Sequence, residues 1–543
     1  MPENNKTKEF LQKLAPCIER GELEACVEEA ARVAREIGIG AVKLSFLSWQ
    51  MGECEKHNFA YTLALAAAPN LKWKEKAKAY SNAGLAAQYL GKLKKAEECF
   101  KQSIESYPKY AEANYNYAIL LKTLERNEEA EKHYLLAIEA NPKFAEAHSN
   151  YAILLKTLKR NEEAEKHYLL AIEANPKLAG AHLNYANLLS EFKRSEEAEK
   201  HYLLTIEANP KLAEAHGAYA LLLFELDIRE KVWDEIERAS NLFKESGRIT
   251  ESYLAWAWFH ELYSEKYFNM RQFPESGEEA RKAGNEYLKA AETADGALKY
   301  NFSQQGNILK AKSFVRKVPK KYWYTKILYR SGGKRDIPGI INNLKQAASF
   351  YEKAAMCPTK ERQDVCSACH TSISVFSDTL SVMEAFINKR SAEINKREWI
   401  NKLDSARLIY EEKKMKNGVA LVDTLKQLIK CIDEMAVHRE GGLGIQKEKC
   451  GKCYNRLTEV SVNLDGALNV LAEHSIEAIR EYAKKQGMSF VNGEPEKSSN
   501  WLIKAIFGAV GAIILGIIAN RLFSWDLDLK LINFVKSITL GTP

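Results

Sequence analysis

Apolar residues recur three and four positions apart along much of the chain, and this spacing is typical of amphipathic α-helices. Segments with this pattern in the second half are too long for ordinary strands. They are found at residues 228–243, 253–267, 276–294, 340–355, 375–387, 420–435 and 457–483. The chain also has only 13 prolines and 28 glycines in 543 residues, which favours long helices over sheets. The pattern therefore predicts an all-α protein with several domains.

The first half of the chain repeats itself with a period of 34 residues. Residues 111–144 and 145–178 match at 30 of 34 positions. A related unit follows at 179–212. The units 77–110, which precedes the array of close copies, and 213–246, which ends it, are less similar in sequence. Residues 1–76 contain two further helix pairs, which we interpret as degenerate or capping repeats. The predicted array therefore covers 77–246.

Each unit has the residues that two packed antiparallel helices require. Small residues stand at repeat positions 8 and 20, an aromatic stands at position 24, and a proline at position 32 ends the second helix. In the unit 111–144 these are Ala118, Ala130, Tyr134 and Pro142. The pattern resembles the tetratricopeptide repeat (TPR) family over about 77–225. The resemblance implies a superhelical solenoid whose first helices line a binding surface.

An asparagine stands at position 6 of successive units, on the helix that lines the binding surface in TPR arrays. A carboxamide can pair with both the C=O and the N–H of an extended peptide. The pattern is similar to the asparagine ladder by which some TPR proteins hold a peptide backbone. The alternative is that these amides are solvated or bonded to a neighbouring helix. The predicted ladder is Asn82, Asn116, Asn150 and Asn184.

Other residues near the ladder are candidates for partner specificity. Lys122 and Lys156 could meet an acidic peptide, although solvated surface charge explains them equally simply. Tyr115 and Asn187 complete the predicted peptide-binding set, and Tyr151 is a further flanking residue that could set specificity. The lysine and asparagine pair of chaperone-binding TPR clamps is missing, which argues against chaperone-tail binding.

Histidines also recur with the repeat, at His133, His167 and His201. Equivalent residues of adjacent repeats lie farther apart than two ligands of one zinc ion allow. We therefore interpret these side chains as surface histidines rather than a metal ladder. Position 4, usually a large aromatic in the family, is Asn114, His148 or His182 in three of the units.

The 34-residue period is lost after the last unit, and residues 247–490 are predicted to form a second helical domain. The overall layout is similar to archaeal TPR proteins that have a helical second half and a C-terminal hydrophobic segment. The net charge of +7 over 543 residues is too small to indicate nucleic-acid binding by itself.

One local cluster, residues 309–335, contains ten Lys or Arg, five aromatics and no acidic residue. It could be a solvated connector, or it could contact anionic lipid or nucleic acid. A nucleic-acid-associated regulator that uses this segment is the alternative function. A membrane segment in the same chain favours lipid over nucleic acid as the partner. The candidate basic patch consists of Arg316, Lys317, Lys320, Lys321, Lys326 and Arg330.

Two CxxC pairs, Cys366 with Cys369 and Cys450 with Cys453, could together bind a structural zinc ion. Their separation of about 80 residues is much longer than usual, so buried reduced thiols are the favoured interpretation. In that case the protein has no cofactor, and a zinc-stabilised assembly factor is a further alternative. The sequence lacks the GxxxxGK[ST], GxGxxG, HExxH and GxSxG motifs, which favours a binding protein over an enzyme.

The C-terminal segment 501–523 is the one stretch of the sequence that is hydrophobic enough for a membrane segment. Its flanking tryptophans and basic residues favour a spanning helix over an interfacial or buried one. Gly508, Ala512 and Gly516 form a small-residue face suited to self-association. Residues 491–500 would be a polar hinge and 524–543 a short tail. We expect a single-pass C-terminal membrane anchor with the body in the cytoplasm, where thiols stay reduced.

The sequence thus predicts a TPR superhelical solenoid followed by a second helical domain and a C-terminal hydrophobic helix. The hypothesis for function is a membrane-tethered scaffold without catalysis. It would bind an extended peptide or a partner protein on its concave surface.

Overall fold

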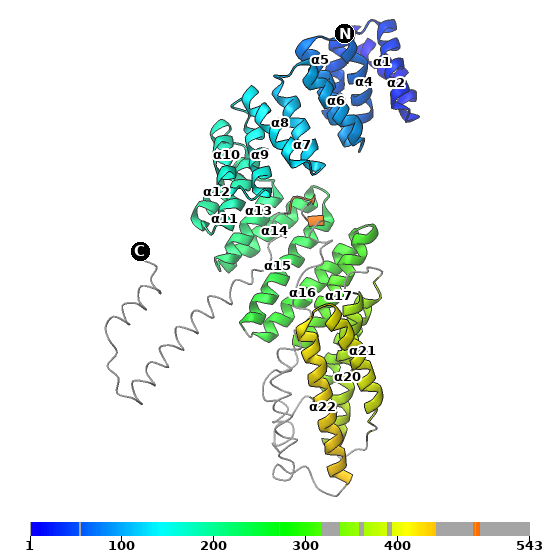
Figure 1. The fold of residues 1–543 in the computed structure, drawn as a ribbon, viewed down its shortest axis with the longest axis vertical. Helices are drawn as coiled ribbons and strands as arrows, with labels where there is room; N and C mark the ends of the chain where they lie inside the picture. Colours follow the sequence, from blue (N-terminus) through cyan, green and yellow to red (C-terminus); the bar gives the residue numbers. More distant parts are fainter. Residues whose placement is uncertain are drawn as a thin grey trace, which may run out of the picture. The chain divides into compact units, whose positions relative to one another are not determined.

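The computed structural model describes residues 2–53, 56–270, 272–316, 337–357, 363–387, 392, 394–440, 482–483 and 485–488. Every regular element in these ranges is helical, so the predicted all-α fold is confirmed (Figure 1). The chain divides into two compact units, Met1–Arg238 and Ala239–Pro543. The division falls inside α14 (Arg229–Glu245).

The first unit is a series of helix hairpins. Along the 34-residue repeats, the first helices of successive hairpins contact one another, α5 with α7, α7 with α9, and α9 with α11. We call these the inner helices and their hairpin partners the outer helices. The bounds are α1 Pro2–Glu19, α2 Leu23–Ile37, α3 Ala41–Glu53, α4 His57–Ala67, η1 Ala68–Asn70, α5 Trp73–Tyr89, α6 Leu93–Ser106, α7 Ala111–Thr123, α8 Asn127–Ala140, α9 Ala145–Thr157, α10 Asn161–Ala174, α11 Ala179–Glu191, α12 Ser195–Ala208 and α13 Ala213–Glu225.

The small and aromatic positions of the repeat form the core of each hairpin, as the sequence predicts. Ala118 and Ala130 are fully buried, and the Tyr134 side chain between them is 1% exposed. In the unit 77–110 the packing is tighter still. A Cβ atom on Gly84 would lie 2.6 Å from the Phe100 ring, so this unit requires glycine where the next units have alanine.

A left-handed residue ends each inner helix of the array and turns the chain back. Gly91 has this conformation at φ 71°, and Glu125 and Lys159 have φ 60° and 62° at the equivalent positions. The following backbone N–H closes the helix end, as when Arg126 N donates to Leu121 O over 2.9 Å. The short turn that results keeps the two helices of the hairpin antiparallel.

A carboxylate on each outer helix joins its unit to the next one. Glu131 accepts hydrogen bonds from the Tyr151 hydroxyl and the Arg160 guanidinium, each over 2.7 Å. Glu97 makes the same two bonds with Tyr117 and Arg126, and Arg126 holds the pKa of Glu97 near 2. Because the donors come from the following hairpin, these bonds fix the stacking of neighbouring units.

The second unit is a helical bundle with its own apolar core. Its helices are long, and α16 and α17 approach so closely that a Cβ atom on Gly284 would lie 2.8 Å from the Gly306 carbonyl. Fully buried side chains such as Leu344, Phe376 and Leu425 belong to its core. The helices after α14 are α15 Ile249–Asn269, α16 Phe273–Thr293, α17 Gly296–Arg316, α19 Ile337–Ala355, α20 Gln363–Ile387, α21 Lys396–Glu412 and α22 Lys416–Glu440.

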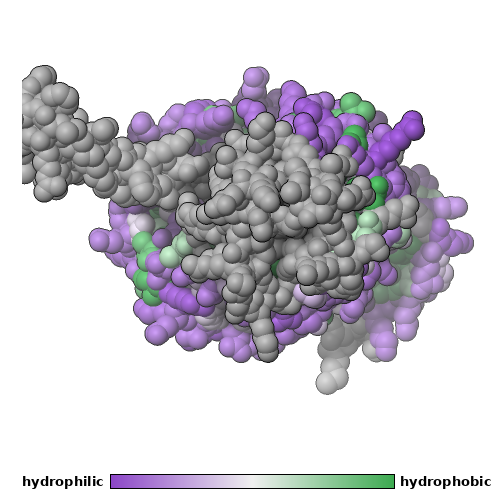
Figure 2. Space-filling view, turned by 90° about the horizontal axis from the view of Figure 1, so that it is seen from below, coloured by the Kyte–Doolittle hydropathy of each residue, from purple (hydrophilic) through white to green (hydrophobic). Residues whose placement is uncertain are grey.

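One face of the molecule is mainly polar where it is described. On the face drawn in Figure 2, most described residues are hydrophilic, and hydrophobic ones lie in small separate groups. Among the residues that the structure describes, no helix combines the length and the hydropathy that crossing a bilayer requires. The segment 501–523, on which the membrane prediction rests, lies outside the described residues.

Candidate functional site

The four asparagines of the predicted ladder lie on successive inner helices, α5, α7, α9 and α11, and all four are half-buried. Asn116 donates a hydrogen bond from Nδ2 to Ser81 Oγ over 3.3 Å, and Asn150 donates one to the Tyr115 hydroxyl over 2.6 Å. Both acceptors lie on the preceding inner helix. Each of these two carboxamides keeps its Oδ1 and a second N–H for another partner.

The residues predicted to flank the ladder are mostly engaged within the chain. Lys156 Nζ lies 2.6 Å from Glu191 Oε1 on the next inner helix, which offsets much of its attraction for an acidic peptide. Asn187 Oδ1 accepts a hydrogen bond from the Tyr202 hydroxyl over 2.8 Å. Lys122 also has an intramolecular partner.

The two tyrosines of the predicted set differ from each other. Tyr115 is half-buried, and its ring lies 4.9 Å from that of Phe144. The prediction for Tyr151 is wrong, because its side chain is 3% exposed and its hydroxyl donates to Glu131. Its ring packs between Tyr134 of the preceding hairpin and His167 of its own outer helix, away from the inner surface.

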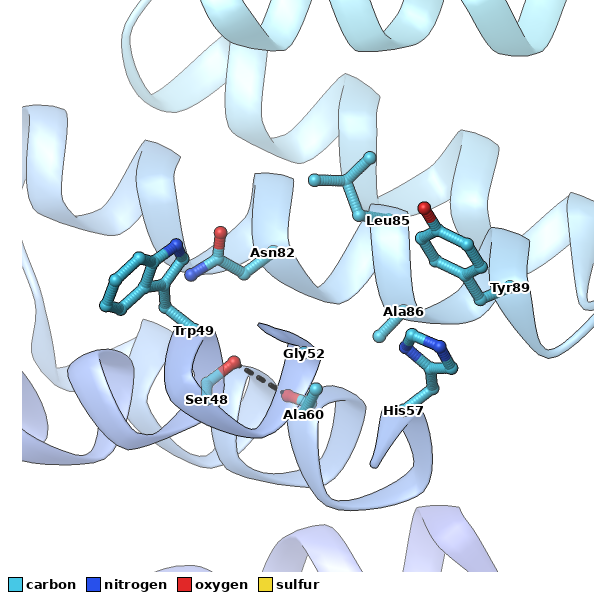
Figure 3. A pocket seen from close by; sticks show the side chains of 9 residues that line it. All are labelled: Ser48, Trp49, Gly52, His57, Ala60, Asn82, Leu85, Ala86 and Tyr89. Carbon is cyan, nitrogen blue, oxygen red and sulfur yellow. Dashed lines mark hydrogen bonds between the residues drawn. The ribbon is translucent and has the colours of Figure 1, made fainter. Parts of the chain in front are cut away.

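A cavity of the first unit opens where α5 meets α3 and α4. It has a volume of about 530 Å³. Trp49 and Tyr89 stand at its two ends, and the Asn82 carboxamide extends between them, close to the indole (Figure 3). The Tyr89 ring stacks on His57 with 4.3 Å between centroids. The lining residues are Ser48, Trp49, Gly52, His57, Ala60, Asn82, Leu85, Ala86 and Tyr89.

This cavity continues towards the next inner helix as a groove. A second hollow of about 430 Å³ shares Leu85 and Tyr89 with the first and extends to Gln88, Asn116 and Ile119. The groove thus runs from α3 across α5 to α7, with two ladder asparagines along it. Trp49 is 50% exposed and Tyr89 is 73% exposed, so both rings are available to a ligand.

The chemistry of the groove suits an extended segment of polypeptide. Its aromatic walls and alanine floor can surround an apolar side chain, while the carboxamides of Asn82 and Asn116 can bond to backbone groups. The Ser48 hydroxyl is already engaged, since it donates to Ala60 O over 2.8 Å. Within the described ranges, no group of three or more His, Cys, Asp and Glu side chains could hold a metal ion.

The repeat pattern indicates the asparagines but not the aromatic end of the groove. Trp49 and His57 belong to α3 and α4, which we treated only as a degenerate cap. The available signal was a pair of large aromatics, Trp49 and Tyr89, at positions that an amphipathic pattern leaves outside the core.

The recurring histidines are paired within each hairpin, which corrects their interpretation as surface residues. His167 Nδ1 lies 2.9 Å from His148 Nδ1, and His201 Nδ1 lies 2.9 Å from His182 Nδ1. In each case the position-23 histidine of the outer helix meets the position-4 histidine of the inner helix. In the next hairpin a carboxylate replaces the second ring, and His216 Nδ1 lies 2.6 Å from Glu235 Oε2.

The hydrogen bonds assign the protons of the paired rings. His148 Nε2 lies 3.1 Å from the Pro142 carbonyl, so this nitrogen must donate. In the neutral ring Nδ1 then accepts, and the His167 Nδ1–H donates to it. Burial, together with the neighbouring His148, lowers the pKa of His167 to about 4. The pair is therefore stable when both rings are neutral.

Among the described cysteines, two form a disulfide and four are buried free thiols. Cys17 and Cys26 form a disulfide between α1 and α2, with 5.7 Å between Cα atoms, so the expectation of reduced thiols is wrong for this pair. Cys366 and Cys369 are buried in α20, and burial raises the pKa of Cys369 to about 12. Cys450 and Cys453 lie outside the described residues, so the four-thiolate zinc site stays a prediction.

Arg316 is the one member of the predicted basic patch that the structure describes, and it is not a surface cation. Its side chain is 3% exposed, and Nη2 lies 2.8 Å from Glu265 Oε1. Residues Lys317, Lys320, Lys321, Lys326 and Arg330 lie outside the described residues. The same holds for Gly508, Ala512 and Gly516.

Two family models, both for the tetratricopeptide repeat, match the chain at residues 81–143 and 133–166. No curated protein matches it. Solved structures similar to this chain include PilF of Pseudomonas aeruginosa, with 18% identity over 39% of this chain and 96% of that chain and a TM-score of 0.34.

Two other similar structures belong to tetratricopeptide repeat proteins. A protein from Parabacteroides merdae ATCC 43184 is 19% identical over 50% of this chain and 98% of its own, with a TM-score of 0.37. YrrB, a TPR protein with an unusual peptide-binding site, is 18% identical over 32% of this chain and 90% of its own, with a TM-score of 0.26.

Proposed function

Since this chain is a tetratricopeptide-repeat protein, we propose that it is an interaction scaffold that binds an extended peptide segment of a partner protein. The observation that carries the proposal is the groove across α3, α5 and α7. It combines exposed aromatic walls with two carboxamides, Asn82 and Asn116, on adjacent inner helices. No catalytic step is part of this proposal.

The groove favours a peptide with a large apolar side chain. Trp49 and Tyr89 would enclose that side chain, and Asn82 and Asn116 would bond to the flanking backbone. The ion pair of Lys156 with Glu191 lies on the inner helices beyond this groove. Recognition should therefore depend on aromatic contact and backbone bonding more than on an acidic peptide sequence.

Replacing Trp49 and Tyr89 together by alanine is expected to weaken peptide binding at least about tenfold, because large aromatic contacts dominate such interfaces. Peptides selected from a display library of random linear sequences on the full chain would supply the probe. Affinities would be measured by fluorescence polarisation. The double variant Asn82→Ala with Asn116→Ala should also weaken binding, irrespective of the peptide sequence.

Tyr300→Ala is the matched control, since Tyr300 is an exposed aromatic, 44% exposed, on α17 of the second unit. It should leave the affinities unchanged. Selected peptides that bind the Trp49 and Tyr89 double variant as tightly as the unaltered chain would contradict the proposal, provided that both proteins have the same helical circular dichroism.

We further propose that residues 501–523 tether this scaffold to a membrane. The support is the sequence, in which an apolar stretch lies between Trp501 and Trp525, with Lys504 and Arg521 near its ends. The full chain is expected to stay with membranes after a carbonate wash, and a version that ends at Glu496 should be released. If the wash releases both, the tether is excluded and the scaffold works without it.

A further inference from the structure

The outer helices α8, α10 and α12 carry the same four residue types on the side opposite their core. These helices follow one another along the first unit (Figure 1). In α10 the core side is formed by Ala164, Tyr168 and Ala171, whereas Leu169 and Leu170 are 47% and 43% exposed. The sets, in which every residue but the half-buried Leu204 is exposed, are Lys132, Leu135, Leu136 and Glu139; Lys166, Leu169, Leu170 and Glu173; and Lys200, Leu203, Leu204 and Glu207.

Each set has a spacing that brings its members onto one helical stripe. The residues stand at i, i+3, i+4 and i+7, which are neighbours on a helix surface. Each stripe therefore has a cation near the helix start, two leucines in the middle and a carboxylate near the helix end. Together the three helices present a row of lysines, a row of leucine pairs and a row of glutamates.

These charges differ from the charges that join neighbouring hairpins. Glu131 and Arg160 are held in the bonds that join neighbouring hairpins. The three lysines and three glutamates of the stripes have no ion-pair partner within the part of the chain that the structure describes. Six leucine positions in a repeating row, of which Leu204 is half-buried and the others are exposed, form an apolar surface that no described segment covers.

The order of residues along a stripe is complementary to itself when two helices meet antiparallel. If the contact is centred between Leu169 and Leu170, then Lys166 of one helix lies opposite Glu173 of the other at both ends, and the leucines meet in the middle. The same pairing holds for the stripes on α8 and α12. A two-fold axis that runs along the row of outer helices produces this arrangement.

We propose that the outer face formed by α8, α10 and α12 is the dimerisation surface for a second copy of this chain. The rows of lysines and glutamates determine which of two possible two-fold arrangements is favourable. A two-fold axis along the helices would place lysines against lysines and glutamates against glutamates, which like-charge repulsion disfavours. A two-fold axis along the row pairs every lysine row with a glutamate row.

Two charge-reversal variants of the full chain test this pairing. One carries Lys132→Glu, Lys166→Glu and Lys200→Glu, and the other carries Glu139→Lys, Glu173→Lys and Glu207→Lys. Each variant alone places like charges across the two-fold axis, so its dimer dissociation constant should rise at least about tenfold. An equal mixture should form heterodimers, because each glutamate row then faces a lysine row.

Sedimentation velocity in one non-ionic detergent would measure the assemblies, with two different fluorophores to detect the heterodimer. A chain that carries all six reversals keeps the original net charge and restores the pairing, so it should dimerise like the unaltered protein. The control variant carries Lys72→Glu, Lys74→Glu and Lys109→Glu at exposed sites outside the stripes. It changes the net charge by the same amount as the lysine-row variant and should leave the dimer intact.

Several results would overturn the proposal. The unaltered chain could remain monomeric at about 100 μM, which is well above the concentrations at which specific dimers form. Both single-row variants could dimerise as tightly as the unaltered chain, in which case self-association uses another surface such as residues 501–523. A mixture that yields no heterodimer would exclude the antiparallel pairing itself.

Discussion

Acidification to about pH 5 is expected to destabilise the repeats that contain the two histidine pairs, His148 with His167 and His182 with His201. In the folded array one ring of each pair donates to the other, and neither has a carboxylate as a direct partner. Burial and the neighbouring His148 disfavour protonation of His167 most strongly; Glu163 favours it to a smaller extent, and Arg160 adds the smallest effect, against protonation. Protonation of both rings would turn two N–H groups towards each other.

The direction of the effect follows from the pKa values. Burial lowers the pKa of His167 and His201 to about 4, whereas an unfolded chain has a histidine pKa near 6.5. The unfolded chain therefore binds more protons below pH 6.5, and stability falls as pH decreases towards 4. The full shift corresponds to about 3 kcal/mol for each ring. Because the rings are only half-buried, we expect roughly 1–2 kcal/mol for each pair.

The free energy of unfolding, from urea titrations at several pH values between about 7 and 5, would measure this loss. The range stays above the region where carboxylates such as Glu97, whose pKa is near 2, lose their bonds. The matched variant is His167→Glu with His201→Glu, which copies the His216 and Glu235 pair of the next hairpin. An imidazolium can donate to that carboxylate, so the variant should lose much less stability. If the free energy of unfolding decreased equally steeply with falling pH in both proteins, the histidine pairs would not be the cause of the loss.

The repeat architecture could be predicted from the sequence because its determinants are local. Ala118, Ala130 and Tyr134 stand at fixed positions in a unit of fixed length, and a near-identical copy follows directly. A helix pair of this kind buries its apolar face only against its neighbours. Periodicity therefore predicted both the helices and the way they stack.

The sites depend on which residues of different helices meet, and the sequence pattern does not contain that information directly. His148 and His167 are 19 positions apart and belong to two helices, so we related each histidine only to its equivalents in other units. Trp49 lies outside the clear repeats, and its place at the groove depends on how α3 packs beside α5. Arg316 belongs to a run of basic residues, yet Glu265 on another helix determines its burial.

Tyr168→Ala is expected to destabilise the array by about 3–5 kcal/mol, because it removes a fully buried aromatic ring and leaves a cavity. The ring lies between the helices of its own hairpin and near Tyr185 of the next one, with 6.2 Å between centroids. Tyr168→Phe is the matched control. Phe100 occupies the same repeat position in the unit 77–110, so loss of the hydroxyl alone should cost less than about 1.5 kcal/mol.

The location of the amides that lose protection in Tyr168→Ala distinguishes a solenoid from a single cooperative core. Each hairpin contacts only its neighbours, so hydrogen exchange in Tyr168→Ala should accelerate in α9 to α12, while amides of α20 in the second unit keep their protection. The groove across α3, α5 and α7 belongs to earlier hairpins, and a peptide selected on it should still bind at low temperature. Uniform loss of protection together with loss of peptide binding would mean that the repeats fold as one unit, since a local defect would then reach the binding groove.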